Sequence, residues 1–553
     1  MEEMFNFVVV GSGAAGLVGA ITASLAGLRP IIIEKSDQWG GTTALSGGVL
    51  WIPENHLMRG ENVDGTDEQA RTYLRGLLGE EATDREIAKA DAYLANAPEM
   101  ARMLADEGVR WIRDAHHPDY YPEVAGNAAG RTIESARFNG RRLGERLKTM
   151  RNASLDLPAI SSSLLGKLTL AWTGPRPFLS AARVAIEHKV RKLLGQQPFG
   201  LGRALVASLM EIAIRLGIPL KLSTRLIEII VEQGSVVGVV AESAGRQMRL
   251  DAPAGVLLAA GGFAQSAALR RTLQGRDEAW SNAIPEDQGD SLVAATAVGA
   301  ATELTDDCWW MPSIQVGPSQ LGLALGLRAL PGSIIVNSRG CRYMNEARAY
   351  MIAGKIMHRE GAGTDRHWLI MDDKFLKRYI FAELSHKNIR ETMMAHGFLK
   401  CADTIADLAV QCGIDPPTFE QTIGRFNGFA RSGHDLDFHR GETDYDRHWA
   451  DPAHKPNPSL GEICKPPFWA ALIRPGDLGT NGGLRTDQHG RVLDAKEQPI
   501  SGLYAAGNGS GSPFGRAYPG AGATIGAAAT FGYIAARHAA SRTNQPAFDV
   551  RAG

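Results

Sequence analysis

The chain has 553 residues, a formal net charge of −1, 44% hydrophobic residues and 22% charged residues. This composition is typical of a soluble globular enzyme and gives no electrostatic reason to expect a nucleic-acid partner. Its five cysteines form no C-x-x-C pair, which argues against a disulfide framework and offers no metal-ligand spacing, so we expect no metal site.

The first predicted unit is a strand, a glycine turn, a helix and a second strand. Phe7–Val10 is a continuous apolar run, typical of a strand buried on both faces. Gly11, Gly13 and Gly16 follow in G-x-G-x-x-G spacing. Such glycines permit a tight turn, a close approach of the backbone to a pyrophosphate, and close packing of helix on strand. The second strand ends at Glu34, placed to accept hydrogen bonds from a ribose. The pattern predicts a dinucleotide site; the alternative is a ligand-free glycine turn.

This early strand leaves no room for a signal peptide, and no apolar run reaches the ~18–20 residues of a membrane helix. We therefore expect a cytoplasmic protein. Residues 65–115 are predicted to be helical, and His116–Glu134 to be a loop because of its Pro and Gly content. Residues 155–216 are both apolar and basic. They predict either a surface helix pair that contacts a membrane or admits an apolar substrate, or an ordinary amphipathic pair with a solvated basic face.

The second half of the chain alternates between strand-rich and helical patterns. Pro219–Leu250 alternates apolar and polar residues, which predicts a β-meander, and Gly255–Ser266 repeats the buried strand followed by glycines. The composition changes near Cys308, and Asp372–Ala430 is largely helical in pattern. Ser501–Ala540 then supplies a third strand, further glycines and a long helix of small residues. The dinucleotide-binding domain is therefore predicted to be discontinuous.

These motifs together resemble the FAD-dependent fumarate reductase/3-ketosteroid dehydrogenase superfamily. The matching segments run in the family's order: GSGAAG with Glu34, GGTTALSGG, LLAAGGF, PGSIIVNSRGCRYMNEARAY, KPNPSLGEICKPPFWAA, GTNGGLRTD, and GLYAAGN with GRAYPGAGATIG. The resemblance implies an α/β fold with a Rossmann-like FAD-binding domain that carries a β-meander insertion. An α+β catalytic domain would be inserted before the C-terminal strand and helix. The expected boundaries are 1–307 with 477–553 for FAD binding, and 308–476 for catalysis.

The resemblance also implies which residues hold FAD. Covalent histidyl members of the family carry a histidine between Glu34 and Leu50, and this sequence has none there, so we expect non-covalent FAD. The expected cofactor-binding residues are Gly11, Gly13, Ala14, Ala15, Gly16, Glu34, Lys35, Gly41, Thr42, Thr43, Ser46, Gly47, Gly48, Ala260, Gly261, Gly507, Asn508, Gly522, Ala523, Thr524 and Ile525.

One position largely indicates the branch of this superfamily, and two further tyrosine positions match the same branch. Tyr350 stands where fumarate reductases carry a proton-donating arginine, which resembles the 3-ketosteroid Δ1-dehydrogenases. Tyr518 to Gly522 match that branch's Y-P-G-x-G motif, and either Tyr120 or Tyr121 matches its third tyrosine. The resemblance implies that Tyr350 takes the C2 proton of a steroid while the C1 hydride passes to flavin N5. The C3 ketone would be held by the Tyr518 hydroxyl and the Gly522 N–H.

The residue types suit this chemistry. A C2 proton becomes acidic only if charge on the C3 oxygen is stabilised, which two aimed donors do. Glycine suits position 522 because it has no Cβ to obstruct the ketone. The base must be a phenol with a lowered pKa, since free tyrosine has a pKa near ~10, and a neighbouring tyrosine that donates to Tyr350 would lower it. Trp309, Trp310 and Met311 are candidate walls of an apolar pocket.

Other interpretations stay open at this point. Tyr350 and Tyr518 could be packing residues. The same scaffold could catalyse 4,5-dehydrogenation of a 5α-3-ketosteroid, or reduce an activated alkene, for which Arg348 and Arg516 are candidate carboxylate ligands. The expected partners are a hydrophobic 3-ketosteroid and an electron acceptor that is a quinone or an artificial dye. Peripheral membrane contact is a further expectation.

Overall fold

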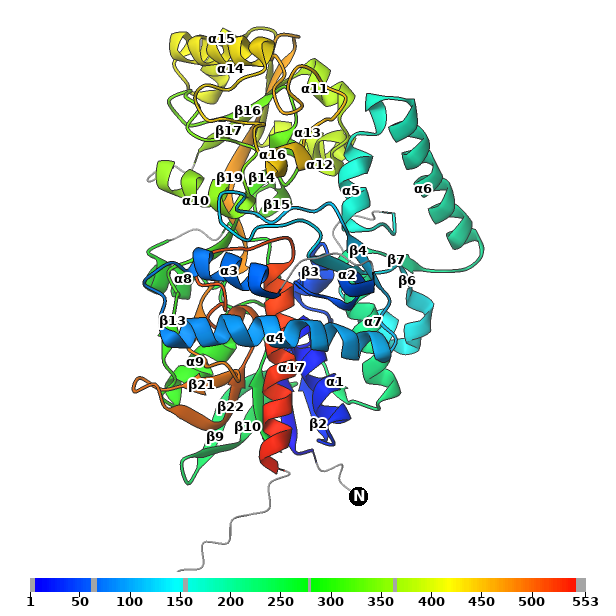
Figure 1. The fold of residues 1–553 in the computed structure, drawn as a ribbon, viewed down its shortest axis with the longest axis vertical. Coiled ribbons are helices and arrows are strands. Elements are labelled where there is room, and N and C mark those ends of the chain that lie inside the picture. The colour runs from blue at the N-terminus through cyan, green and yellow to red at the C-terminus, as the bar shows by residue number, and fades with distance from the viewer. Residues whose placement is uncertain (1–4, 61–66, 153–157, 277–279, 362–365, 544–553) are drawn as a thin grey trace, which may run out of the picture.

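The computed structural model describes residues 5–60, 67–152, 158–276, 280–361 and 366–543 (Figure 1). The two ends of the expected FAD-binding domain, 1–4 and 544–553, lie outside these ranges, as do residues 155–157 of the apolar and basic segment.

A nine-stranded sheet forms the lower half of the molecule in Figure 1. Strand β1 (Phe7–Val10) lies parallel to β12 (Gly255–Leu258) on one side and to β2 (Pro30–Ile33) on the other. All residues of these three strands are buried, as their unbroken apolar runs predict. Strand β22 (Pro499–Ala505) pairs in parallel with β12, so the C-terminal part of the chain completes the sheet.

The expected β-meander is confirmed beside this parallel core. Strands β9 (Thr224–Glu232), β10 (Ser235–Ser243) and β11 (Arg246–Asp251) pair antiparallel in sequence order. Strand β8 (Leu220–Lys221) pairs with β2 at the other edge of the sheet, and β21 (Arg491–Leu493) pairs with β22. The α/β fold predicted from the sequence is therefore correct.

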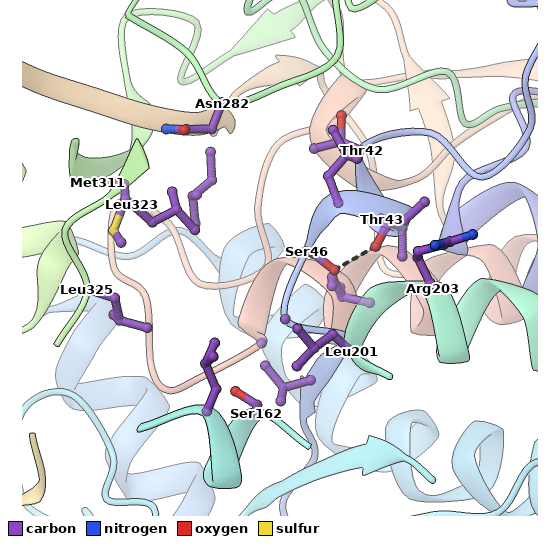
Figure 2. Close-up of a pocket in the computed structure, with 18 of the residues that line it drawn as sticks. Thr42, Thr43, Ser46, Ser162, Leu201, Arg203, Asn282, Met311, Leu323 and Leu325 are labelled. Atoms are coloured by element: carbon purple, nitrogen blue, oxygen red, sulfur yellow. Dashed lines mark hydrogen bonds between the residues drawn. The ribbon is translucent and has the colours of Figure 1, made fainter. Parts of the chain in front are cut away.

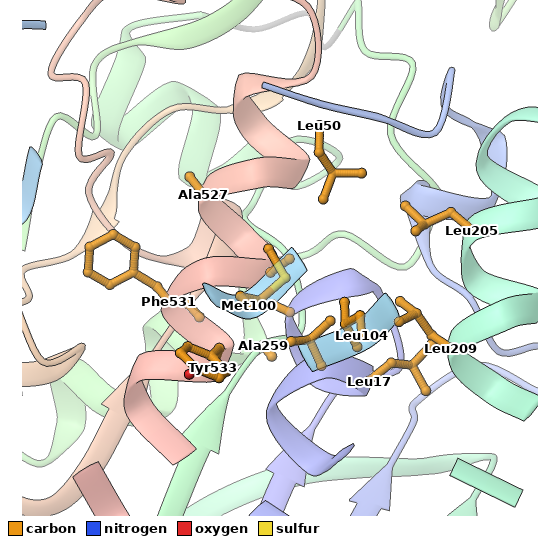
Figure 3. Packing of buried hydrophobic residues seen from close by; sticks show 14 of the residues in the cluster. Leu17, Leu50, Met100, Leu104, Leu205, Leu209, Ala259, Ala527, Phe531 and Tyr533 are labelled. Carbon is orange, nitrogen blue, oxygen red and sulfur yellow. The ribbon is translucent and has the colours of Figure 1, made fainter. Parts of the chain in front are cut away.

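Two helices cover one face of the sheet, and two more pack behind them. Helix α1 (Ala14–Leu25) packs along α17 (Ala523–Thr543) on the sheet, while α7 (Leu201–Arg215) contacts α1 and α4 (Asp84–Asp106) contacts α17. Figure 3 shows the side chains of these four helices meeting in one apolar cluster. Glycine lets α1 and α17 approach closely, because a Cβ on Gly532 would lie 2.4 Å from a carbonyl oxygen of α1.

A second, six-stranded sheet forms the upper half (Figure 1). Its strands are β14 (Cys308–Gly317), β15 (Gln320–Leu323), β16 (Ser333–Val336), β17 (His367–Asp372), β18 (Leu399–Ala402) and β19 (Phe468–Thr480). All pairings within it are antiparallel. The helices of this half are α10 (Tyr350–Glu360), α11 (Asp373–Arg378), α12 (Ala382–Ser385), α13 (Lys387–Ala395), α14 (Ile405–Cys412), α15 (Pro416–Ser432) and α16 (Asp444–His448).

Two sequence-based predictions were wrong in part. The loop predicted for His116–Glu134 runs into strand β5 (Thr132–Ser135). Residues 65–115 are not all helical: α3 (Asp67–Leu78) and α4 are followed by strand β4 (Trp111–Asp114). That strand pairs with β5, which also pairs with β3 (Val49–Trp51). Pairing between segments this far apart in sequence overrides the local helical pattern.

Helices α5 (Ser162–Thr169) and α6 (Pro175–Leu193) form a hairpin at the right of Figure 1. Val184 is the one residue of α6 that is buried. No helix within the described ranges is long and apolar enough to cross a membrane. The remaining short elements are β6 (Phe138–Asn139), β7 (Pro198–Phe199), β13 (Thr302–Glu303), β20 (Gly483–Leu484), α2 (His56–Gly60), α8 (Ala267–Gln274) and α9 (Asp290–Ala297).

The contact between α1 and α17 yields a stability prediction. Gly532→Ala forces a methyl group against the Ala15 carbonyl, and such overpacking costs about 1–3 kcal/mol. Gly428→Ala in α15 is the matched control, because nothing lies within 4 Å of its added Cβ and alanine is favoured over glycine in a helix by up to about 1 kcal/mol. In urea unfolding of the flavin-loaded protein, the free energy of unfolding should therefore fall for Gly532→Ala and rise for Gly428→Ala. Equal changes in the two variants would contradict the packing account.

Candidate active site

One continuous cavity of about 1940 Å³ joins the two halves of the molecule. It exceeds the roughly 300–1,000 Å³ of an ordinary small-molecule pocket, so it has room for a cofactor and a substrate together. Figure 2 shows the hydroxyl-bearing side chains of Thr42, Thr43 and Ser46 on one side of this cavity, and Met311, Leu323 and Leu325 on the other. One wall is therefore polar and the opposite wall apolar.

The polar end begins at the turn between β1 and α1. Gly11 adopts φ +105°, and a Cβ there would lie 2.4 Å from the Ala259 carbonyl oxygen, so this turn requires glycine. A Cβ on Gly13 would meet only the Thr43 hydroxyl, at 3.5 Å. The first turn of α1 carries no acidic side chain. No acidic side chain of the helix itself therefore competes for its positive dipole end, which faces the cavity.

Glu34 fixes this turn from the end of β2. Its carboxylate accepts hydrogen bonds from the Ser12 backbone N–H at 3.0 Å, from the Ser12 hydroxyl at 2.6 Å and from the Ser36 N–H at 3.0 Å. The side chain also lines the cavity. Each carboxylate oxygen can accept more than one hydrogen bond, so holding the turn leaves Glu34 able to bind a ribose hydroxyl.

Most of the expected cofactor residues line the cavity. Those that do are Gly11, Gly13, Ala14, Ala15, Glu34, Lys35, Gly41, Thr42, Thr43, Ser46, Gly47, Ala260, Gly261, Gly507, Asn508, Gly522, Thr524 and Ile525. Gly16, Gly48 and Ala523 lie behind its surface. Gly16 and Gly48 allow close backbone packing. A Cβ on Gly16 would lie 1.9 Å from the Gly11 carbonyl oxygen, and a Cβ on Gly48 would lie 2.4 Å from the Leu201 backbone.

Three buried tyrosines meet at the junction of the two halves. The Tyr350 and Tyr120 rings lie 5.1 Å apart, Tyr350 and Tyr518 lie 5.2 Å apart, and Tyr120 stacks on Tyr518 at 5.6 Å. The Tyr350 hydroxyl is hydrogen-bonded to those of both Tyr120 and Tyr518. All three line the cavity. Helix α10 begins at Tyr350, while the other two tyrosines come from loops of the lower half.

The structure separates the two adjacent tyrosines of the loop. Tyr120 faces Tyr350, whereas Tyr121 does not line the cavity and accepts a hydrogen bond from the Tyr518 N–H at 3.1 Å. Tyr73 in α3 connects the Tyr121 loop to the Tyr518–Gly522 segment. Its hydroxyl donates to the Pro519 carbonyl at 2.8 Å and accepts from the Tyr121 N–H at 3.2 Å. The Tyr518–Gly522 segment is thus held by two tyrosines outside the cavity.

Gly522 is glycine for a different reason from the one expected. Its φ is +85°, and a Cβ would lie 2.1 Å from the Val49 carbonyl oxygen in β3. Contact with β3, rather than access for a ketone, therefore excludes a side chain here. The Tyr518 hydroxyl is hydrogen-bonded to the Thr524 hydroxyl at 3.1 Å and to the Gly522 backbone, so the two expected ketone donors lie next to each other.

Burial raises the pKa of Tyr350 well above the ordinary value of about 10. The neighbouring Tyr120 and Tyr518 raise it further, through their own charge when ionised and as acceptors of hydrogen bonds from its hydroxyl. Burial also raises the pKa of Tyr120 and Tyr518. The expected lowering of the Tyr350 pKa is therefore not produced by the protein surroundings alone.

Several residues behave differently from their sequence-based interpretations. Met311 lines the cavity, but Trp309 supports Tyr518 from behind, with ring centroids 5.2 Å apart, and Trp310 packs on His358. Arg348 pairs with Glu123 and Arg516 with Asp306, and neither arginine lines the cavity. Neither arginine is therefore placed to bind a carboxylate substrate there.

The comparisons with known proteins agree with this geometry. A family model described as "FAD binding domain" matches residues 6–525. The chain belongs to this FAD-binding family. FAD is therefore its cofactor, and the polar turn, the glycines and the hydroxyl groups of the cavity fit its pyrophosphate and ribose.

Close relatives within the family carry specific names. The 3-oxosteroid 1-dehydrogenase of Mycobacterium tuberculosis is 40% identical over 564 residues, which cover 98% of this chain and 99% of that protein. The 4-oxocyclohexanecarboxylate 2-dehydrogenase of Sinomonas cyclohexanicum is 34% identical and covers 97% and 93%. The crystal structure of 3-ketosteroid Δ1-dehydrogenase from Sterolibacterium denitrificans with 1,4-androstadiene-3,17-dione superposes with a TM-score of 0.91, at 35% identity and 98% and 100% coverage. The family resemblance noted in the sequence is confirmed.

The sequence did not identify the residues of the apolar cavity wall, which lies opposite the expected cofactor-binding residues. Leu323 and Leu325, near β15, and Trp449, after α16, line the cavity. These are ordinary apolar residues without a motif, so only the fold identifies them. Asp114, His117 and His448 also line it and were not predicted.

Loss of the Tyr121 hydroxyl should reduce turnover without removing FAD. Tyr121→Phe leaves the Tyr518 N–H without its acceptor, and an unsatisfied buried donor costs about 1–3 kcal/mol. We expect kcat/KM to fall about tenfold in steady-state assays, with flavin content unchanged. Tyr343→Phe, which removes a hydroxyl bonded to His367 at a position that does not line the cavity, is the control. Equal kinetics for Tyr121→Phe and wild type would contradict this positioning.

Proposed function

We propose that this chain catalyses the FAD-dependent 1,2-dehydrogenation of a 3-ketosteroid. The observation that carries the proposal is the buried Tyr350–Tyr120–Tyr518 cluster, which opens into the same cavity as the cofactor turn. The relatives named 3-oxosteroid 1-dehydrogenase and the product complex of the Sterolibacterium denitrificans enzyme support it.

The cavity residues divide the chemistry between them. The Tyr518 hydroxyl and the Gly522 N–H donate to the C3 ketone and stabilise the negative charge that develops on its oxygen. Tyr350, ionised to a phenolate that the Tyr120 hydroxyl stabilises by a hydrogen bond, removes the C2 proton and becomes a neutral phenol. When bound, FAD supplies the acceptor for the hydride that leaves C1. A C1–C2 double bond then replaces the two C–H bonds.

The cavity favours this reaction over the alternatives. Its wall of leucine, methionine and tryptophan side chains suits a rigid apolar ring system. Arg348 and Arg516 are occupied by other carboxylates, which disfavours reduction of an unsaturated dicarboxylate. The names of the most similar relatives favour position 1 over 4,5-dehydrogenation.

We further propose that residues 1–307 and 477–553 bind FAD, held non-covalently, and that 308–476 form the catalytic domain. The separate nine- and six-stranded sheets support this division. A quinone, or an artificial dye in assays, is the proposed electron acceptor. Both are planar, largely apolar molecules that can enter the same cavity after the product leaves.

The α5–α6 hairpin is proposed to contact a membrane surface. Trp172, Leu179, Leu193 and Leu194 are 58%, 65%, 87% and 72% exposed, and α6 also carries several lysines and arginines. Exposed apolar groups beside cations are the pattern of a helix that lies on an anionic bilayer. The same hairpin lines the cavity through Ala181 and Val184, so it offers an apolar steroid a route from the lipid.

Removing the phenol of Tyr350 should abolish turnover. Tyr350→Phe eliminates the base, and general-base catalysis contributes roughly 10²–10⁴-fold. We expect a loss of that size in steroid dehydrogenation, with the flavin spectrum retained. Tyr379→Phe, whose hydroxyl bonds to Asp451 outside the cavity, should keep wild-type activity. Because the pKa of Tyr350 is raised, the wild-type chemical step should accelerate with pH through pH ~9. A flat profile, or an active Tyr350→Phe, would refute the assignment.

Vesicle binding should depend on the hairpin. The double variant Leu193→Ser with Leu194→Ser removes the most exposed apolar pair of α6. We expect co-sedimentation with vesicles rich in phosphatidylglycerol to be lost, while dehydrogenation of steroid dispersed in detergent persists. Leu436→Ser, at a residue 73% exposed elsewhere, should bind vesicles as wild type does. Undiminished binding by the double variant would argue against this surface.

A further inference from the structure

Three residues able to bind a metal lie together in the cavity wall, apart from the cofactor turn. Asp114, His117 and His448 each offer one ligand atom, and these atoms lie within 4.8 Å of one another. Strand β4 ends at Asp114, His117 lies in the loop that carries Tyr120, and α16 ends at His448. Asp114 and His448, which are 334 positions apart in the sequence, therefore lie close together at the junction of the two halves.

His117 offers a ring nitrogen that no protein group uses. The residue is 7% exposed, and its Nδ1 lies 3.7 Å from Asp114 Oδ2. Its Nε2 is buried and has no hydrogen-bond partner among the described residues. A buried polar atom of this kind normally has a partner, so the atom points to a ligand outside the chain.

His448 is held as metal-binding histidines usually are. Its ring lies 4.5 Å from the His117 ring, centroid to centroid, and hydrogen-bonds to the His116 backbone. Metal-ligating histidines commonly donate their second ring nitrogen to a backbone carbonyl, which fixes the ring and its tautomer.

We propose that Asp114, His117 and His448 bind a divalent transition-metal ion of the Zn²⁺ type. Two imidazoles and one carboxylate are ligands that suit such ions. Ligands about 2.0–2.1 Å from Zn²⁺ in a tetrahedron lie about 3.4 Å apart. The three ligand atoms, within 4.8 Å of one another, are spaced wider than this. Small side-chain rotations would bring them to the tetrahedral spacing, and water would complete the coordination.

The ion would connect the two halves of the protein across the cavity. His117 and Asp114 belong to the lower half and His448 to the upper half, so an ion bound by all three would connect the two halves directly. The His117 ring also lies 6.2 Å from that of Tyr120. Binding to the folded state alone should therefore raise the unfolding temperature. The inference does not depend on which substrate the enzyme dehydrogenates.

Zinc titration of the metal-depleted, tag-free, flavin-loaded protein tests the proposal without steroid. Isothermal titration calorimetry with ZnCl₂ should show one site with a Kd below about 10 μM. His117→Ala and His448→Ala should each weaken binding by at least about 100-fold. His116→Ala is the matched control, since this neighbour is exposed and outside the cluster, and should bind as wild type does.

Two further measurements keep the test decisive if an alanine variant folds poorly. Asp114→Asn preserves shape and should also weaken zinc binding, with flavin content unchanged. X-ray absorption of the zinc-loaded wild type should show two imidazoles and oxygen ligands at about 2.0–2.1 Å. Absence of binding below about 100 μM, unchanged affinity in His117→Ala or His448→Ala, equal loss in His116→Ala, or sulfur ligation would overturn the proposal.

Discussion

The structure depends on the backbone contact between the first helix and the last. Gly532 lets α1 and α17 touch, since a Cβ there would lie 2.4 Å from the Ala15 carbonyl oxygen, and a Cβ on Gly19 would lie 3.3 Å from the Gly532 carbonyl oxygen. This contact brings the segment before α17 back to the β1–α1 turn. Tyr518 and Gly522 therefore reach the cofactor end of the cavity although they lie more than 500 residues from Gly11.

Interlocking loops then fix the tyrosines. The Tyr120 N–H donates to the Pro519 carbonyl at 3.0 Å, and Tyr73 donates to the same oxygen. Asp119, buried beside Tyr120, accepts from Trp51 Nε1 at 2.7 Å and pairs with Arg131. Buried polar networks of this kind hold side chains in a single arrangement when every member is satisfied. The loop and the Y-P-G-x-G segment therefore behave as one rigid support.

Burial acts in two directions on Tyr350. It raises the pKa and so disfavours the phenolate, but a base of high pKa is also strong once it is ionised. The Tyr350 hydroxyl donates to Tyr120 and Tyr518, which stabilises the neutral phenol and also raises the pKa. The apolar wall keeps water from competing for the ketone, which strengthens the two donors aimed at it.

Local patterns predicted much of the fold. The G-x-G-x-x-G turn, the meander and the C-terminal strand and helix all appear where their sequences indicate, because each depends on short-range periodicity. Strand β4 was missed because its partner β5 lies about 20 residues further along the chain. The reason for Gly522 was also misjudged, since its contact with Val49 is invisible in the sequence.

The candidate site was predicted in part. Family motifs gave Tyr350 and Tyr518, but they left Tyr120 and Tyr121 unresolved, because adjacent residues in a loop carry no periodicity. Only the three-dimensional structure places one in the cavity and the other behind Tyr518. Leu323, Leu325 and Trp449 carry no sequence signal, so their place in the wall follows from packing alone.

The most direct test is anaerobic mixing of the purified, flavin-loaded protein with androst-4-ene-3,17-dione. Flavin absorbance and product mass would be followed together. The account predicts bleaching of the flavin and a product that has lost two hydrogens between C1 and C2. No bleaching by the steroid, together with reoxidation of pre-reduced flavin by an enone or an unsaturated acid, would contradict it and make the protein an alkene reductase.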